Sequence, residues 1–138
     1  MIEAFFDRFY VEKEDFDLYD ELEKDKEFPF TYHPEIFLLS ACIGYKYNLR
    51  VPLEEPKQLT QKTSVLNLEY APTIYDAFKS IAIIHKELDE NGHLKVKTIM
   101  EEFAKGGFRK LYGEILGNSS KKGENLLNYV LLNLYGNE

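Results

Sequence analysis

Three histidines, one cysteine and twenty-four carboxylates are the side chains of this sequence best suited to catalysis or metal binding. His33, His85 and His93 lie far apart and show none of the short spacings that build a metal site on a helix. The single cysteine, Cys42, also argues against structural zinc. His85 falls on an apolar stripe, where a hydrogen-bonded core histidine is commoner than a catalytic base. We therefore expect no metal and no cofactor.

The carboxylates and glycines form no recognisable catalytic motif either. Paired carboxylates can act as acid and base catalysts where a pocket shifts their pKa values apart. Exposed acids on a helix surface are the more common explanation of such pairs. Gly106-Gly107 lacks the further glycines and the Lys-Ser/Thr pair of a phosphate-binding loop. The sequence thus predicts a protein that is not an enzyme. A site joining Glu101 or Glu102 to His85 is the remaining catalytic alternative, and it would require a pocket.

Two clusters of basic and aromatic residues are the strongest binding candidates. The first cluster comprises Tyr45, Lys46, Tyr47 and Arg50, and the second comprises Lys105, Arg109 and Lys110. Arginine forks and aromatic rings suit a carboxylate, a phosphate or a nucleic-acid strand. Cations near the end of a helix also favour its dipole, which is a purely structural explanation. If the two clusters meet in space, they form one binding face.

Charge is distributed unevenly along the chain. Residues 1–30 contain eleven acids and four bases, whereas residues 31–138 contain thirteen of each. An acidic segment on a neutral body argues against broad electrostatic binding of duplex DNA. We interpret residues 1–30 as an acidic amphipathic helical arm and residues 31–138 as a helical body, together one domain. The arm either packs on the body or detaches to dock on another protein.

A buried central helix must position the first cluster. It is predicted to begin near Pro34, because proline in the first helical turn loses only an amide that would be unpaired there. Positions 36–43 are apolar almost throughout, which is typical of a helix buried on all sides. Gly44 or Asn48 can supply the left-handed residue that ends it. A long polar connection follows, with a short extended segment expected around residues 66–70.

Apolar periodicity predicts further helices on both sides of the central one. In the arm, one helical pattern extends to Tyr10, and a second contains Phe16, Tyr19 and Leu22. After the long connection, Thr73 is expected as the N-cap of a helix that ends at Asn91-Gly92. The next helix is expected to terminate at Gly106-Gly107, and another to begin at Phe108. A last helix carries the apolar residues Leu126, Leu127, Val130, Leu131 and Leu134.

These patterns predict a mainly α fold, a compact single-domain bundle of about five to six helices. No stretch approaches the roughly 18 apolar residues of a membrane span, and no signal-peptide pattern is present. We expect a cytoplasmic protein that does not contact membrane.

Two segments of the chain resemble a known family. They are Ala41-Cys42-Ile43-Gly44-Tyr45-Lys46 followed by Arg50-Val51-Pro52-Leu53, and Glu101-Glu102-Phe103-Ala104-Lys105-Gly106-Gly107-Phe108 with Leu111. Over roughly residues 33–116 the chain looks like small accessory proteins encoded beside bacterial Dnd systems. Those systems install phosphorothioates in DNA and restrict unmodified invaders. The resemblance implies an accessory role in an anti-phage defence cluster, and it carries no catalytic residues.

Two functions remain open from the sequence. The leading one is a non-enzymatic adaptor of a defence or DNA-modification complex, which contacts proteins through its acidic arm and its last helix. The alternative is a small nucleic-acid-binding module that uses the two basic clusters and is restrained by the acidic arm. The last helix has a wide apolar face, which either inserts into the core of a monomer or leaves a patch for homodimerisation or for a partner.

Overall fold

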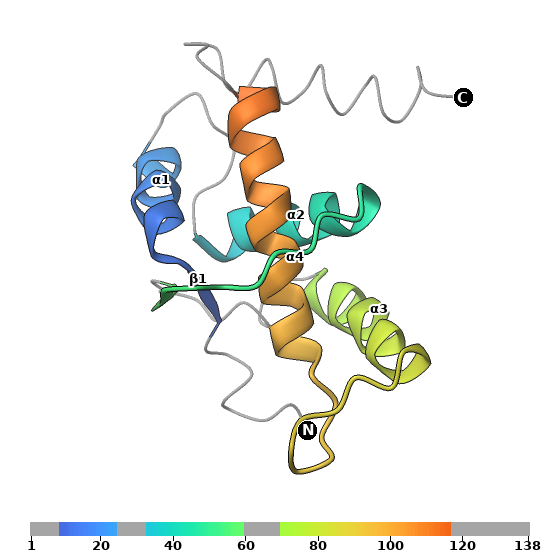
Figure 1. The fold of residues 1–138 in the computed structure, drawn as a ribbon. Helices are drawn as coiled ribbons and strands as arrows, with labels where there is room; N and C mark the ends of the chain where they lie inside the picture. Colours follow the sequence, from blue (N-terminus) through green and yellow to red (C-terminus); the bar gives the residue numbers. More distant parts are fainter. Residues whose placement is uncertain (1–8, 25–32, 60–69, 117–138) are drawn as a thin grey trace, which may run out of the picture.

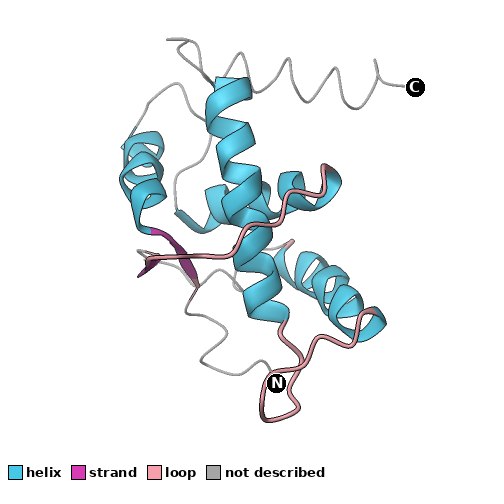
Figure 2. Ribbon diagram, viewed as in Figure 1, coloured by secondary structure: helices cyan, strands magenta, loops and turns pink. Residues whose placement is uncertain are grey.

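The computed structural model describes residues 9–24, 33–59 and 70–116, with side chains up to residue 113. Along the chain these residues form β1 (Tyr10–Glu12), α1 (Lys13–Lys24), α2 (His33–Lys46), β2 (Pro56–Gln58), α3 (Ala71–Ile84) and α4 (Val96–Lys110), which continues as the π-helical segment η3 (Leu111–Leu116). The expected mainly helical class is confirmed (Figure 2). The described residues contain four α-helices, so the predicted count of five to six is not confirmed, and the last predicted helix lies outside them.

Helix α4 is the axis of the fold (Figure 1). Helix α2 crosses it, while α1 and α3 lie on opposite sides of it. Helix α2 is the buried central helix that the sequence predicts, because its apolar residues point in all directions and most find a neighbour there. Its fully buried members include Ile36, Phe37, Leu38 and Ala41. It ends at Lys46, and Asn48 is the residue with a left-handed backbone (φ 55°).

Glycines allow the backbones of α2 and α4 to touch where the two helices cross. A Cβ atom on Gly107 would lie 1.7 Å from the backbone oxygen of Ser40, and one on Gly44 would lie 1.9 Å from the backbone oxygen of Phe103. The prediction that a helix terminates at Gly106-Gly107 is therefore wrong. Both glycines are inside α4, where they allow close approach of other backbone and have no positive φ. Gly107 approaches α2, and Gly106 approaches Leu49, which follows α2.

The N-terminal segment packs into the same core. Val11 of β1 and Tyr19 and Leu22 of α1 are buried, in agreement with the predicted periodicity of α1. Tyr10 belongs to a strand and not to a helix, because β1 pairs antiparallel with β2 from Tyr10 opposite Gln58 to Glu12 opposite Pro56. A valine beside an aromatic residue suits a strand. Residues 1–8 of the predicted arm helix lie outside the described part of the chain.

The boundaries of α3 differ from the predicted ones. The helix begins at Ala71, and Tyr70 at its N-cap position makes no side-chain capping bond, so Thr73 is not the cap. It ends at Ile84, well before Asn91-Gly92, because Lys86 adopts a left-handed backbone (φ 51°). His85 is exposed there, so the expectation of a core histidine at this position is wrong. Of the extended segment expected around residues 66–70, only Tyr70 is described, and it occupies the N-cap position of α3.

None of the helices in the described ranges combines the length and apolar composition needed to cross a membrane.

Candidate functional site

Arg50 of the first basic cluster is engaged inside the molecule. Its guanidinium donates two hydrogen bonds to Glu87 (2.8 and 2.7 Å) and one to Glu102 (2.7 Å), and it lies 5.8 Å from the ring centre of Phe103. The hydrogen bonds to Glu87 are the main reason that the pKa of Arg50 is raised. This fork fastens the connection after α2 to α4 and to the turn after α3.

Lys105 of the second cluster is buried and paired with an acid of the N-terminal segment. Its ammonium lies 2.6 Å from a carboxylate oxygen of Glu12 and donates to the backbone oxygen of Pro52 at 2.9 Å. Glu12 also accepts the backbone amides of Glu54 and Glu55. Burial alone would raise the pKa of Glu12, but these hydrogen bonds outweigh it and hold the pKa at about 2.

Two exposed contacts continue this seam between α1 and the end of α4. Arg109 donates to Glu14 at 3.1 Å, and the hydroxyl of Tyr112 donates to Glu21 at 3.2 Å. Acids of the N-terminal segment therefore contact two cations of the second cluster, Lys105 and Arg109. Spacing in the sequence carries no signal for this arrangement, since the paired residues are more than 90 positions apart.

Three residues from the two clusters do meet. Lys46 and Lys110 place their ammonium groups 5.4 and 4.3 Å from the ring centre of Tyr47. The structure thus brings one cation from each predicted cluster to a single aromatic ring, which we call the Tyr47 patch (Lys46, Tyr47 and Lys110). Tyr45 lies elsewhere: its ring is half exposed and meets the edges of Phe78 and Phe103.

Residues of β1 line two clefts. One, of about 320 Å³, lies between α1 and the 54–55 turn and is lined by Glu12, Lys13, Glu14, Asp17, Glu54, Glu55, Lys105 and Arg109. The other, of about 330 Å³, contains Glu101, whose pKa is raised to about 7 by burial although Lys97 and an amide oppose this. A carboxyl near neutrality in a cleft is a candidate acid or base. His85 is exposed and does not line either cleft, so the expected partner of Glu101 is not beside it.

An exposed apolar surface lies at the end of α3. Ile83, Ile84 and Leu88 are 56, 72 and 50 % exposed, and we call these three residues the α3 patch. The sequence contained a signal for it, because the run Ile81-Ala82-Ile83-Ile84 places apolar side chains on every face of one helical turn. Only Ala82 of that run is buried. This helix was predicted to extend to Asn91-Gly92, so the run was not recognised as the exposed end of α3.

Comparison with known proteins identifies the family. A sequence model of the family described as DNA sulphur modification system-associated protein 4 matches residues 8–135. No curated protein and no solved structure matches the chain. The matched range includes both segments on which the resemblance to Dnd-associated accessory proteins rested, so that resemblance is confirmed. The chain belongs to the family of DNA sulphur modification system-associated protein 4.

Proposed function

We propose that the protein is a non-enzymatic accessory subunit of a bacterial DNA sulphur modification system with an anti-phage role, and that it acts by binding another protein of that system. The α3 patch carries this proposal. Its three large apolar side chains are each half or more exposed and lie within residues 83–88. Exposed apolar surface is unfavourable in water, and patches of it mark protein-binding surfaces. The family match names the system in which the partner is to be sought.

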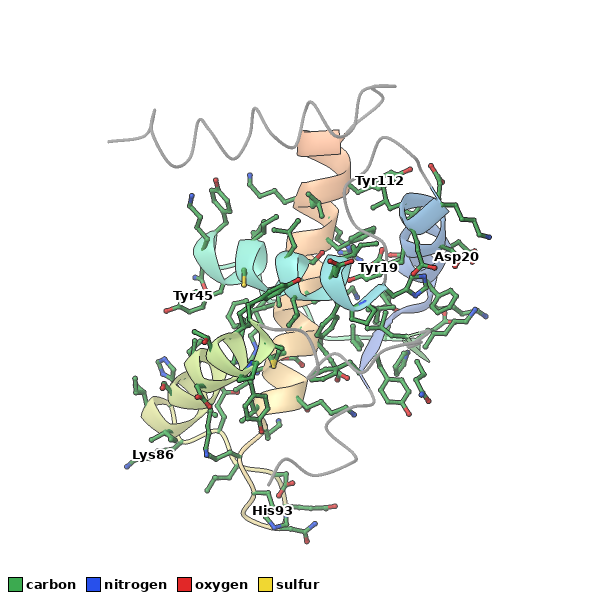
Figure 3. All side chains as sticks on the ribbon, turned by 180° about the vertical axis from the view of Figure 1, so that it is seen from behind. Tyr19, Asp20, Tyr45, Lys86, His93 and Tyr112 are labelled. Carbon is green, nitrogen blue, oxygen red and sulfur yellow. The ribbon has the colours of Figure 1, made fainter. Side chains whose placement is uncertain are left out.

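The charged surface of the N-terminal segment supports an adaptor role. Lys86 lies in the turn between Ile84 and Leu88 of the α3 patch, and Asp20 lies on α1. Their side chains project from opposite sides of the molecule (Figure 3). The apolar surface and the acidic surface are therefore well separated. A protein that joins two others needs two such separate contact surfaces, and here they differ in chemistry.

Co-purification tests the adaptor proposal. Tagged protein would be isolated at moderate salt from cells that carry the complete modification system. The double substitution Ile83→Asp and Ile84→Asp is expected to lower recovery of the partner at least about tenfold, because each anchor contributes ~1–2 kcal/mol and 1.4 kcal/mol corresponds to a factor of ten. The matched control is Thr73→Asp with Ala77→Asp, which adds the same charge at exposed positions of the same helix.

Each outcome of that experiment decides a specific point. Equal loss in both double variants would show that added charge on α3 is responsible and not the apolar contact. A partner retained by all variants would remove the α3 patch from the proposal. If no protein of the modification system co-purifies with the unsubstituted protein, the adaptor function itself is wrong.

The Tyr47 patch favours a second candidate function, the binding of a nucleic-acid strand. Two cations around one ring suit a phosphate beside a stacked base. The N-terminal segment contacts Lys105 and Arg109, as a restraining acidic arm would. Deleting residues 1–30 is nevertheless a poor test of restraint, because Val11, Tyr19 and Leu22 belong to the core.

Salt-dependent binding by the full chain tests this second function. A labelled single strand is expected to bind at low salt, with log affinity falling by ~1 to 2 per tenfold increase in salt, since about two phosphates are neutralised. Lys46→Ala with Lys110→Ala should abolish this binding. Lys79→Ala with Lys86→Ala, two exposed lysines on and after α3, should leave it unchanged. Binding that both pairs reduce equally would reflect net charge alone, and no binding at low salt would exclude this function.

A further inference from the structure

One histidine and two carboxylates converge where α1 meets α2. Asp20 and Glu23 are three residues apart on α1 and share one face of that helix. His33 is the first residue of α2. Its Nε2 atom lies 3.2 Å from Oδ1 of Asp20 and 3.8 Å from Oε2 of Glu23, and one donor atom from each residue lies within 4.8 Å of the other two.

Neighbouring groups orient all three side chains. The His33 ring is fully buried and is held by edge contacts with the rings of Phe16 (5.2 Å between centres) and Tyr19 (5.8 Å). The backbone amide of His33 donates to Oε2 of Glu23 at 2.8 Å. Such outer contacts fix the direction of the donors before any ligand arrives.

Both carboxylates keep an open side toward solvent. The side chain of Asp20 is 41 % exposed and that of Glu23 is 18 % exposed, so the group of three has a buried base and an accessible mouth. Lys24 donates to Oδ2 of Asp20 at 3.3 Å, which leaves Oδ1 facing His33.

We propose that Asp20, Glu23 and His33 form a binding site for a divalent transition-metal ion of the zinc type. Bonds of ~2.0–2.2 Å to nitrogen and oxygen place neighbouring donors of a tetrahedral ion about 3.4 Å apart. The two distances from Nε2, 3.2 and 3.8 Å, bracket that value. Imidazole as a ligand favours zinc, cobalt or nickel over magnesium and calcium, which prefer oxygen ligands alone.

Metal binding at this position would fasten α1 to α2. The two helices are connected by chain that enters α2 at His33, so an ion held by Asp20 and Glu23 on one side and by His33 on the other crosslinks them. The acidic N-terminal segment would then be held on the body more firmly. The site is separate from the α3 patch, which lies on the opposite side of the molecule (Figure 3), so it can be tested independently of the partner binding assigned to that patch.

Zinc titration of the full chain tests the site directly. We expect one equivalent of Zn²⁺ to bind, to raise the melting temperature, and to shift the Nε2 resonance of His33 in histidine nitrogen spectra. His85 and His93, which are exposed, provide internal controls for weak surface binding. Asp20→Asn and Glu23→Gln should each weaken binding at least about tenfold. Asp17→Asn, an exposed acid on the same helix, should not change it.

Two results would overturn the proposal. If Zn²⁺ perturbs only His85 and His93, or if Asp20→Asn and Glu23→Gln bind as tightly as the unsubstituted chain, the ion is adventitious. If one equivalent of Zn²⁺ changes neither the His33 resonance nor the melting temperature, the three residues are only a hydrogen-bonded contact between helices. The nuclear resonance measurement uses the unsubstituted protein, so it remains decisive even where a variant fails to fold.

Discussion

Replacing Gly107 with alanine is expected to destabilise the fold by about 3 to 5 kcal/mol, a large share of the ~5–15 kcal/mol that stabilises a typical domain. The new Cβ would lie 1.7 Å from the backbone oxygen of Ser40 and 2.5 Å from the backbone nitrogen of Gly44. Backbone atoms of a buried helix cannot turn aside as a flexible side chain can, so α2 and α4 must separate. The roughly 1 kcal/mol that alanine gains over glycine inside a helix is too small to offset this.

Two other glycines are matched controls for that substitution. No described residue lies within 4 Å of where a Cβ on Gly113 would be, so Gly113→Ala is expected to be neutral or to stabilise η3 by up to about 1 kcal/mol. Gly92 likewise has no neighbour within 4 Å in the described part of the chain but has a positive φ of 82°, so Gly92→Ala should cost about 1–2 kcal/mol through backbone strain alone. Urea unfolding would measure all three. Similar losses at Gly107 and Gly92 would contradict the direct contact of α2 with α4.

Replacing Lys105 with methionine is expected to cost about 3–5 kcal/mol, because it leaves the Glu12 carboxylate buried without its cation. Glu12→Gln should cost a similar amount by leaving the Lys105 ammonium unpaired. The double variant should lose less than the sum of the two single losses, since neither charge is then stranded. Chemical unfolding of the four proteins gives this coupling, and strictly additive losses would show that the two residues do not interact.

The exposed pair Glu14 and Arg109 is the control for this buried pair, because it also joins the N-terminal segment to α4. Its side chains are 69 and 49 % exposed, so Arg109→Met should cost less than about 1 kcal/mol. The buried pair should also depend on pH. With a pKa of about 2 in the fold against the ordinary 4.5, Glu12 stabilises the fold above about pH 4.5, and this contribution is lost as the pH falls through 2. The stability difference between unsubstituted and double-variant protein should shrink accordingly.

The sequence alone determined the local features of this protein. The nearly unbroken apolar run at 36–43 required a buried helix, and the spacing of Phe16, Tyr19 and Leu22 required an amphipathic one. Both are repeats within a few residues, which a helix converts directly into a face. The family could also be predicted from the sequence, because the resemblance rests on short segments that are recognisable there, and the family match confirms it.

The end of a helix could not be predicted reliably from glycine in the sequence, for a physical reason. The same residue serves two purposes: it adopts a positive φ at a helix end, and it lacks a Cβ where two backbones touch. Gly107 has the second use, and its partners Ser40 and Gly44 are more than 60 positions away. Nothing local distinguishes the two uses.

Only the tertiary structure decided which charged groups meet. Lys105 and Arg109 read as a binding cluster in the sequence, yet Glu12 and Glu14 contact them from the other end of the chain. His85 was expected to be buried but is exposed. His33 is the buried histidine, and it lies beside Asp20 and Glu23. Electrostatic interactions depend on distance in space and on burial. Neither is encoded by separation along the chain, so the fold alone established these contacts.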